Sequence, residues 1–582
     1  MSKLNVDQKS IKSLFQDKKA DFLIPDYQRP YAWGIEECEI LWEDIFEFAI
    51  PENDYTKFEQ NSEYFLGPIV MFKNKGDKQE IIDGQQRLTT LMLLLRAFYD
   101  RFTRMKDLES EELKKDIERC IWKTDELGKL EKNLLKIDSE VATDDDKEEF
   151  LYILKNGVLP SKLKSNYAKN YKFFLDKIEE FLFQYPSYFP YLPARIINNC
   201  IILPIEAESL DTALRIFSTL NDRGLPLSDS DIFKSQFYKF FMNQGEKEEF
   251  INEWKELERK AKLAFDDNNY NSMNELFTKY MYYERAKQGI KKSTTEALRK
   301  FYEKDKYSLL KSREVFDNLK ILVDFWLNIK NQDKEYFSTD VLKKLFVLDK
   351  APNSMWEYFT TVYFMVNKKE GENGYRLDNE EFSIFLDITI GFIFAYAFTN
   401  PGVNALRNPV YNEMVKIVNR ERITFENYTF NKEQLYDLMK NFKFTNQRPI
   451  TKSILAWWAY SEKNQNLISL DRGLEIEHIF SKNRQDIERS LIDETNLESI
   501  GNKVLLETNI NIRASDYRFN DKKKYYKGFT TSKGVLKQPT ELIELHHLSD
   551  ELNDFTEENI LARKNNIINS FILYLETIGL AN

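Results

Sequence analysis

Residues 81–91 of the chain read Ile-Ile-Asp-Gly-Gln-Gln-Arg-Leu-Thr-Thr-Leu, and they pass from a strand pattern into a helix pattern. A short strand over residues 80–82 stops at Asp83 and Gly84. A helix begins near Arg87, because apolar residues then recur at the spacing of one helical face. These residues are Leu88, Leu91, Met92, Leu95, Phe98 and Phe102. The stretch therefore predicts a domain that mixes strands with helices.

Similar short strands are expected elsewhere in the first part of the chain. Phe22–Pro25, Tyr64–Phe72 and Ile201–Ile205 have the apolar, β-branched and aromatic character of strands. Between them lies a charged segment, residues 106–149, whose Asp-rich part at 143–146 is expected to be a solvated loop or a helix cap. This first region ends near Tyr238.

The rest of the chain has mainly helical patterns. Long charged faces alternate with aromatic stripes from about Phe240 to Asn400, and we interpret the stripes as core packing. The scarcity of Gly (18) and Pro (15) disfavours an all-β fold. The predicted fold class is α+β and mostly helical. The 582 residues are too many for one ordinary core, and we predict three domains, at residues 1–240, 241–400 and 401–582.

Charge and composition limit where the chain acts. Its net charge of −11 means that nucleic acid must bind at a local basic patch. The three cysteines are far apart and form neither a disulfide framework nor a zinc knuckle, which fits a reducing cytoplasm. Residues 1–19 lack the apolar core of a signal peptide. The longest apolar stretch, Ile388–Phe398, is shorter than the roughly 20 residues of a bilayer span, so we predict a buried helix and no membrane.

The turn at residues 83–87 has the features of an anion site. The free N–H groups at the start of a helix favour anions, and Arg87 adds a fixed positive charge. Asp83 could hold a metal or position water, and Gln85 and Gln86 could bind phosphate or a base. The GxxxxGK[ST] signature of a P-loop is absent from this segment.

Two further polar clusters lie in the first region. Residues 25–33 read Pro-Asp-Tyr-Gln-Arg-Pro-Tyr-Ala-Trp, where aromatic rings can stack on a base and Gln or Arg can bond its edge. Residues 221–231 include Asn221 and Arg223, and their last part is also a helix N-cap signal. Each cluster alone is more often a structural turn. Three such clusters in one region favour a shared anion pocket.

The C-terminal region contains the first histidine of the chain. His478 follows Glu477, and Asn502 and Asn511 come soon after. We expect a strand over 474–480 and a second over 503–506, with Asn511 at the start of a helix. A histidine can take a proton from water, while an acid and an amide can hold a hard cation. Adjacent residues on an ideal strand face opposite sides, so a shared site for Glu477 and His478 requires a bend.

A basic segment follows the histidine motif. Residues 511–537 carry eight Lys or Arg and two Asp, a net +6, with Tyr525, Tyr526 and Phe529 interleaved. Such composition is typical of surfaces that follow a phosphate backbone. The alternative interpretation is a lone histidine in a polar loop beside a solvated basic helix. The expected DNA contacts are Arg513, Arg518, Lys522, Lys523, Lys524 and Lys527.

Residues from about 10 to 238 resemble the DUF262 family. The matching stretches are residues 24–33, 83–91 and 217–224, together with Asp231 and Lys234. The resemblance implies a ParB/sulfiredoxin-like mixed α/β fold and nucleoside triphosphate hydrolysis. It places Asp83 and Arg87 in the hydrolytic centre. It implies a nucleotide site formed by Tyr27, Gln28, Arg29, Asp83, Gly84, Gln85, Gln86, Arg87, Thr89, Asn221 and Arg223.

Residues from about 401 to 575 resemble DUF1524, a family of HNH (His-Me finger) nucleases with a ββα-metal centre. The match covers residues 477–479, 501–506, Asn511 and the lysines at 522–524. That family usually has proline as the third residue after the histidine, where this chain has Ser481. The two regions together are similar to GmrSD-type (type IV) modification-dependent restriction enzymes and to SspE-like anti-phage nucleases.

The resemblance implies a cytoplasmic, nucleotide-regulated DNA endonuclease of phage defence. In this hypothesis His478 is the general base, Asn502 orients it or fixes its loop, and Glu477 with Asn511 binds Mg²⁺ or Mn²⁺. The expected partners are DNA, including modified phage DNA, and GTP, UTP or ATP; a homo-oligomer is left open. Two alternatives remain: a nucleotide-responsive regulator that binds nucleic acid with an inert nuclease centre, and an RNase of abortive defence.

Overall fold

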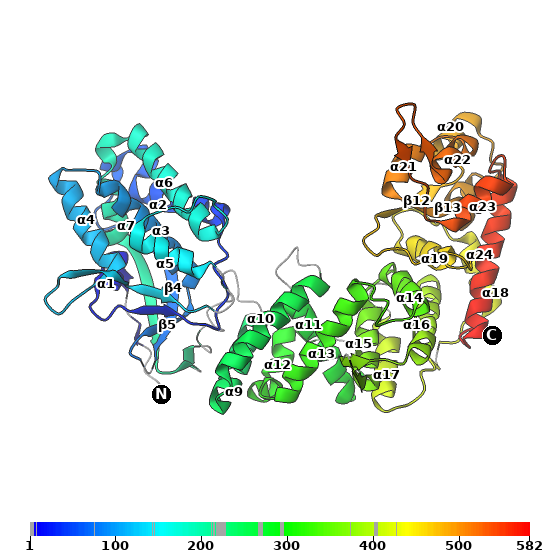
Figure 1. Ribbon diagram of the computed structural model, residues 1–582, viewed down its shortest axis with the longest axis horizontal. Helices are drawn as coiled ribbons and strands as arrows, with labels where there is room; N and C mark the ends of the chain where they lie inside the picture. Colours follow the sequence, from blue (N-terminus) through cyan, green and yellow to red (C-terminus); the bar gives the residue numbers. More distant parts are fainter. Residues whose placement is uncertain are drawn as a thin grey trace. The chain divides into compact units, whose positions relative to one another are not determined.

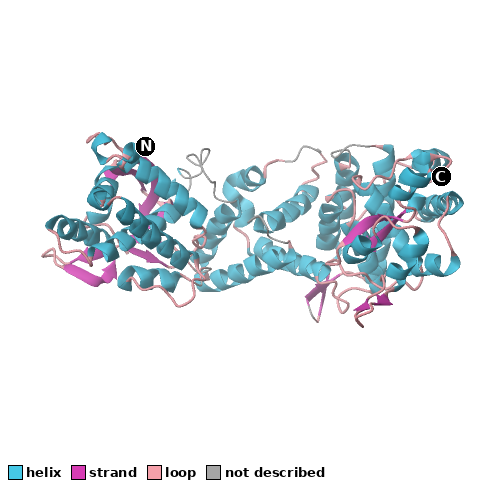
Figure 2. Cartoon of the chain, turned by 90° about the horizontal axis from the view of Figure 1, so that it is seen from above, coloured by secondary structure: helices cyan, strands magenta, loops and turns pink. Residues whose placement is uncertain are grey.

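The computed structural model of the chain is mostly helical, with small groups of strands (Figures 1 and 2). It describes residues 5–6, 8–74, 76–141, 144, 146–210, 212–213, 216, 229–265, 272–291, 296–372, 374–400, 406–426 and 428–582. The chain divides into two compact units, residues 1–256 and 257–582. The predicted α+β, mostly helical class is confirmed. The division into three domains stays a prediction; the second unit contains all of the predicted third domain and residues 257–400 of the predicted middle domain.

The first unit is built on a mixed sheet. Its strand order is β1-β9-β4-β5-β3-β8, with β2 also paired to β9. β4 and β9 are parallel, β4 and β5 antiparallel, and β3 is parallel to both β5 and β8. The strands are β1 Asn5–Val6, β2 Lys9–Ser10, β3 Phe22–Ile24, β4 Tyr64–Lys73, β5 Gln79–Asp83, β8 Ile137–Ser139 and β9 Cys200–Ala207. A separate hairpin pairs β6 Trp122–Thr124 with β7 Leu130–Leu135. The four strands predicted from sequence are all present.

Helix α3, Gln85–Phe102, is the central helix of this unit, and almost all of its residues are buried. It packs against α4, α5 and α6 (Figure 1), and Phe98 on it stacks near Trp42 of α2. The helices are α1 Ile11–Gln16, α2 Ile35–Ala49, α4 Leu108–Ile121, α5 Lys147–Asn156, α6 Asn166–Gln184, α7 Tyr191–Asn199 and α9 Asp229–Gln244, and α10 Lys247–Ala264 includes the boundary of the two units.

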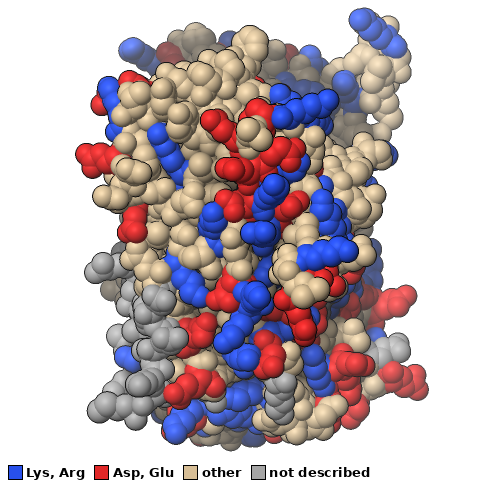
Figure 3. Space-filling view, turned by 90° about the vertical axis from the view of Figure 1, so that its left-hand side faces the viewer, with Lys and Arg blue, Asp and Glu red and all other residues tan. Residues whose placement is uncertain are grey.

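On the face in Figure 3 acidic and basic side chains are interspersed.

We predicted a solvated loop or a helix cap for the Asp-rich part of the charged segment, and its described residues agree only in part. Asp144 is buried and accepts a hydrogen bond of 2.5 Å from the Tyr167 hydroxyl. Asp146 occupies the N-cap position of α5. One part of this segment is therefore interior and another is a helix cap.

The second unit begins as a stack of helices with aromatic cores. Phe325 lies 4.0 Å from Phe364, ring centre to ring centre, and Tyr363 lies 4.0 Å from Phe385. These contacts agree with our interpretation of the aromatic stripes as core packing. The helices are α11 Ser272–Lys287, α12 Leu298–Tyr307, α13 Arg313–Lys330, α14 Thr339–Asp349, α15 Met355–Asn367 and α16 Asn379–Thr399, and a small hairpin joins β10 Lys369–Gly371 to β11 Gly374–Arg376.

Helix α16 contains the longest apolar stretch of the chain. It spans 21 residues, which by length and composition could cross a membrane, but 67% of its apolar window is buried inside the protein. Its partners include α14, α18 and α19. It is therefore longer than the 388–398 stretch suggested, and it serves as a core helix.

The last part of the second unit surrounds one antiparallel pair of strands, β12 Leu474–His478 and β13 Lys503–Glu507. Helix α19 packs on β13, and α24 packs on the turn before β13. The helices are α17 Arg407–Val418, α18 Lys432–Asn441, α19 Pro449–Ala459, α20 Lys482–Glu488, α21 Thr508–Ala514, α22 Phe519–Lys527, α23 Ile543–Glu551 and α24 Glu557–Thr577, and β14 Phe529–Thr530 pairs with β15 Leu536–Lys537.

Candidate active site

The pair β12–β13 carries the histidine motif on a regular ladder. Pairing continues to the end of β12, with Glu477 opposite Val504 and His478 opposite Lys503. The strand does not bend at these residues, so the side chains of Glu477 and His478 leave on opposite faces. The shared site that the sequence analysis considered is therefore not formed.

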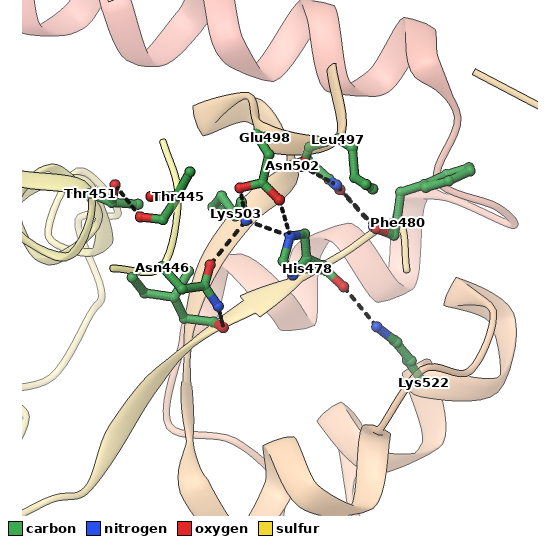
Figure 4. Close-up of polar contacts among 11 residues, drawn as sticks. Thr445, Asn446, Thr451, His478, Phe480, Leu497, Glu498, Asn502, Lys503 and Lys522 are labelled. Carbon is green, nitrogen blue, oxygen red and sulfur yellow. Dashed lines mark hydrogen bonds and ion pairs between the residues drawn. The ribbon is translucent and has the colours of Figure 1, made fainter. Parts of the chain in front are cut away.

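His478 lies in a polar cluster at the end of β12 (Figure 4). Its Nε2 atom is 3.2 Å from Glu498 Oε1 and also contacts the ammonium of Lys503. Lys503 is fully buried, and its Nζ donates to Glu498 Oε2 at 2.9 Å and to Asn446 Oδ1 at 3.0 Å. Asn446 in turn donates to the carbonyl of Ile476 at 3.1 Å. The cluster thus joins both strands of the pair to the loop before α19.

This environment keeps the imidazole uncharged. Burial, assisted by the nearby positive charge of Lys503, lowers the pKa of His478 to about 4. The side chain remains 20% exposed. A neutral imidazole with some access to solvent can accept a proton from water.

Asn502 fixes the backbone that follows the histidine. Its Oδ1 accepts from the Phe480 N–H at 2.7 Å, and its Nδ2 donates to the carbonyls of Phe480 at 3.0 Å and Leu497 at 3.1 Å. The Ile479 N–H donates to the Asn502 carbonyl at 2.9 Å. The side chain is fully buried. Asn502 therefore holds the loop, and no hydrogen bond joins it to the His478 ring among the described residues.

Ser481 occupies the position at which the resembled family usually has proline. It is the N-cap of α20, and its side chain accepts a hydrogen bond of 3.2 Å from the Arg484 N–H. A serine cap satisfies a donor at the helix start that proline could not. The loop after His478 is therefore fixed by a serine N-cap, where the resembled family usually has the ring of a proline.

Glu477 and Asn511 have separate partners. Glu477 is buried, and its Oε1 accepts from Lys522 Nζ at 2.6 Å and from the Tyr526 hydroxyl at 3.2 Å. Asn511 Nδ2 instead donates to Glu475 at 2.7 Å. The described residues also contain no group of three His, Cys, Asp or Glu placed to hold a metal. The predicted pair does not fit a cation as arranged here.

Helix α24 supports the turn that carries this cluster. Arg563 Nη1 donates to the carbonyls of Ile500 at 3.1 Å, Gly501 at 3.1 Å and Lys503 at 2.6 Å, and the rest of its guanidinium pairs with Glu544. A Cβ on Gly501 would lie 2.0 Å from the Ile560 carbonyl oxygen. Only glycine allows the turn to approach the helix this closely.

The turn at residues 83–87 joins β5 to α3 in the first unit. Gly84 has φ +90°, and a Cβ there would lie 2.8 Å from Ile69 Cγ1, so the turn needs glycine. Gln85 donates to the Arg29 carbonyl at 3.3 Å, and Gln86 donates to Pro30 and accepts from the Ala32 N–H at 2.7 Å. The two glutamines hold the loop of residues 25–33 and do not present their amides to a ligand.

Other residues of the predicted nucleotide site are also used inside the protein. Gln28 donates to the Ile82 carbonyl at 3.2 Å, and the Tyr27 hydroxyl donates to Glu80 at 3.3 Å. Thr89 is 2% exposed. Tyr27 and Gln28 thus bond to β5 and Thr89 is buried in α3, whereas we predicted ligand contacts for all three. Asn221 and Arg223 lie outside the described residues.

Arg29, Asp83 and Arg87 remain as a half-buried charged group beside the start of α3. Arg87 Nη1 donates to the Pro68 carbonyl at 3.1 Å, and its guanidinium packs where a side chain on Gly67 would lie. Burial raises the pKa of Asp83 and lowers that of Arg87, while their mutual attraction opposes both changes. The Nε atom of Arg29 is buried without a hydrogen-bond partner among the described residues. Guanidinium groups and the free N–H groups of a helix start are both groups that attract anions.

Both regions match known protein families. Residues 11–238 match the model of the GmrSD restriction endonuclease N-terminal domain, and residues 430–570 match that of the GmrSD restriction endonuclease C-terminal domain. The chain belongs to the GmrSD-type restriction endonucleases. The family gives it an endonuclease role in phage defence, with DNA as substrate. A comparison with curated proteins found no match.

In this GmrSD-type enzyme several basic residues of the segment are engaged by neighbouring groups. Lys522 is 1% exposed and bound to Glu477, so it is not a DNA contact as predicted. Lys523 donates to the Leu552 carbonyl at 2.8 Å, and Arg518 and Lys527 form exposed ion pairs with Glu488 and Asp550. Exposed pairs contribute little energy and can be exchanged for phosphate.

Arg513 and Lys524 are the best placed of the predicted DNA contacts. Lys524 is exposed and lies over the Tyr525 ring at 4.8 Å. Arg513 lines a pocket of about 560 Å³ that also includes Arg472 and Lys537. Its Nε is buried without a hydrogen-bond partner among the described residues.

Sequence reasoning missed Glu498, Lys503 and Asn446 as neighbours of His478, and Arg563 as their support. Asn446 lies in a turn before α19, and Arg563 lies on α24, so neither is near His478 in sequence. Lys503 follows Asn502 directly in the GmrSD-type motif. Its position opposite His478 in the ladder is the one feature that strand alternation could have indicated.

Proposed function

We propose that this restriction endonuclease is a cytoplasmic enzyme that cuts modified DNA under the control of a nucleoside triphosphate. The family relationship supports cleavage of DNA. The nucleotide, the divalent cation and the preference for modified DNA are the additional parts of the proposal. A restriction enzyme must distinguish foreign DNA from host DNA, and a DNA modification is one chemical difference that supplies this distinction.

The observation that carries the cleavage step is the position of His478, neutral and partly exposed on a rigid strand end. His478 takes a proton from water while the water oxygen bonds to phosphorus. The opposite P–O bond breaks, and the leaving oxygen carries away the electron pair and gains a proton from solvent. Fixing the base in advance lowers the barrier, because no ordering remains to be done in the transition state.

A phosphodiester also gains charge in the transition state, so we propose that cleavage needs Mg²⁺ or Mn²⁺. This part rests on the chemistry of the substrate. Glu477 and Asn511 are engaged with Lys522 and Glu475, so this pair does not hold the ion as arranged.

The nucleotide is proposed to bind at the start of α3. The half-buried group Arg29, Asp83 and Arg87 supports this part. Two guanidinium groups and the helix N–H groups suit a triphosphate, and Asp83 is an acid that could position the attacking water.

The central test compares His478→Ala with His547→Ala, a matched control on an exposed histidine of the same unit. Each protein is incubated with modified DNA, unmodified DNA and RNA, with Mg²⁺, Mn²⁺ or EDTA, and with GTP, UTP, ATP or none. We expect metal-dependent cutting of modified DNA that His478→Ala abolishes and His547→Ala retains. NTP hydrolysis should survive in both variants.

Two outcomes would replace the proposal. Cutting of RNA but not DNA would favour the abortive-defence RNase. Absence of cutting of every substrate, with nucleotide and DNA still bound, would favour a regulator with an inert centre. Light scattering on the same preparations measures whether the enzyme is a homo-oligomer.

A further inference from the structure

Two groups beside His478 Nε2 have opposite hydrogen-bonding requirements, because one is an acceptor and the other is a donor. Glu498 Oε1, 3.2 Å away, is an acceptor and needs a proton on Nε2. The Lys503 ammonium is a donor and needs a lone pair there. A neutral imidazole carries its proton on one nitrogen only, so its tautomer satisfies one of these neighbours.

The partners of the two neighbours differ. Lys503 Nζ has other acceptors, Glu498 Oε2 at 2.9 Å and Asn446 Oδ1 at 3.0 Å (Figure 4). Among the described residues, Glu498 Oε1 has no hydrogen-bond partner except His478. Glu498 is thus held through one oxygen by a buried cation, and it presents the other oxygen to the ring.

We propose that Glu498 is the positioning residue of the catalytic histidine and that it accepts a hydrogen bond from the Nε2–H of His478. This inference rests on the proposed role of His478 as the base. The ring is then fixed with Nδ1 unprotonated, and Nδ1 is the atom that takes the proton from water. Once Nδ1 is protonated, the Glu498 carboxylate stabilises the imidazolium.

Lys503 and Asn446 hold Glu498 in position. The buried ammonium fixes the carboxylate, and Asn446 links that ammonium to the Ile476 carbonyl of β12. The geometry of the carboxylate is therefore set by both strands of the pair. A buried charge that retains its partners holds a single arrangement, because losing one of them is costly.

The tautomer can be measured directly on the full chain. Histidine labelled with ¹⁵N gives distinct ring shifts for the two tautomers, and His478→Gln identifies the His478 signals among the three histidines of the chain. Near pH 7 we expect Nε2–H in the parent protein. In Glu498→Ala we expect Nδ1–H, because Lys503 then becomes the neighbour of Nε2. Nδ1–H in the parent protein would overturn the proposal.

Cleavage kinetics provide a second readout. Glu498→Ala should lower kcat by about 10²- to 10⁴-fold with little change in KM, and Glu498→Asp should recover part of the loss. Glu494→Ala, in the same short helix as Glu498, is the control and should leave the tautomer unchanged. An unchanged kcat in a folded Glu498→Ala protein would refute the positioning role.

The tautomer is measured without DNA, metal or nucleotide. Failure of the His478→Ala test would contradict the proposed function. The spectrum would still report which neighbour is hydrogen-bonded to Nε2. Conversely, a parent protein whose cleavage depends on His478 but whose ring carries Nδ1–H would exclude only the positioning role of Glu498.

Discussion

The ammonium of Lys522 lies 2.6 Å from the Glu477 carboxylate, and both side chains are buried. Lys522 also donates to the His478 carbonyl at 2.7 Å. A residue from the segment expected to contact DNA is thus an internal support for the strand that carries the proposed base, His478. Neighbouring lysines of one run therefore have different roles: Lys522 supports the fold, and others remain candidates for DNA binding.

Lys522→Met should destabilise the second unit strongly. It leaves the Glu477 carboxylate buried without its cation, and breaking such a pair costs about 3–5 kcal/mol. Calorimetric unfolding measures the effect, with Lys524→Met as the control, since an exposed lysine should change stability by no more than about 0.5 kcal/mol. Equal melting temperatures for the two variants would mean that the pair does not support the fold.

Asn502→Ala should lower both stability and cleavage. The substitution leaves the buried N–H and C=O of Phe480 without partners, at about 1–3 kcal/mol for each unsatisfied group. Asn441→Ala, an exposed asparagine whose amide bonds within its own helix, is the comparison. If Asn502→Ala loses cleavage with no change in melting temperature, its role is chemical and the loop-fixing interpretation is wrong.

Gly67→Ala should weaken nucleotide binding by moving Arg87. The new Cβ would lie 2.9 Å from Arg87 Nη1, and a lost charge-assisted bond of about 1.5–3 kcal/mol corresponds to roughly 10- to 100-fold in affinity. Gly128→Ala is the matched control, because Gly128 also has a positive φ but has open space around it. Titration calorimetry with GTP, UTP and ATP makes the comparison, and equal affinities would exclude Arg87 from the nucleotide site.

Arg513→Ala and Lys524→Ala should reduce the salt dependence of DNA binding. Each removed phosphate contact lowers the slope of log affinity against log salt by about 1. The measurement is made in the His478→Ala background so that the DNA is not cut. Lys523→Ala should leave the slope unchanged, because Lys523 donates to the Leu552 carbonyl. A larger change for Lys523 than for Arg513 would contradict this assignment.

The fold was predictable where local pattern decides it. The strands near residues 22, 64, 80 and 201 and the helix after Gly84 follow from apolar periodicity and from a turn that needs glycine. Asp144 was expected in solvent, because a run of acids usually is, but Tyr167 and the fold around it give that carboxylate a buried partner. Such a contact depends on residues that sequence spacing does not bring together.

The site was predictable in part for the same reason. His478 and Asn502 belong to one motif, and strand alternation alone indicates that Glu477 and His478 face apart. The partners of Glu477 come from α22, whereas His478 contacts Glu498 in the turn before β13 and Lys503 at the start of β13. A basic run in sequence could not reveal which lysines are internal, since burial is decided by the packing of α22.

The contact between Gly501 and α24 has a consequence for synthesis. The turn that presents Glu498, Asn502 and Lys503 is completed by Arg563 and by the backbone of Ile560. A polypeptide still emerging from the ribosome, with residue 563 not yet released, lacks that completion. The proposed cutting centre is therefore assembled late, and we expect fragments of this enzyme that end before residue 560 to be harmless to the DNA of the cell that makes them.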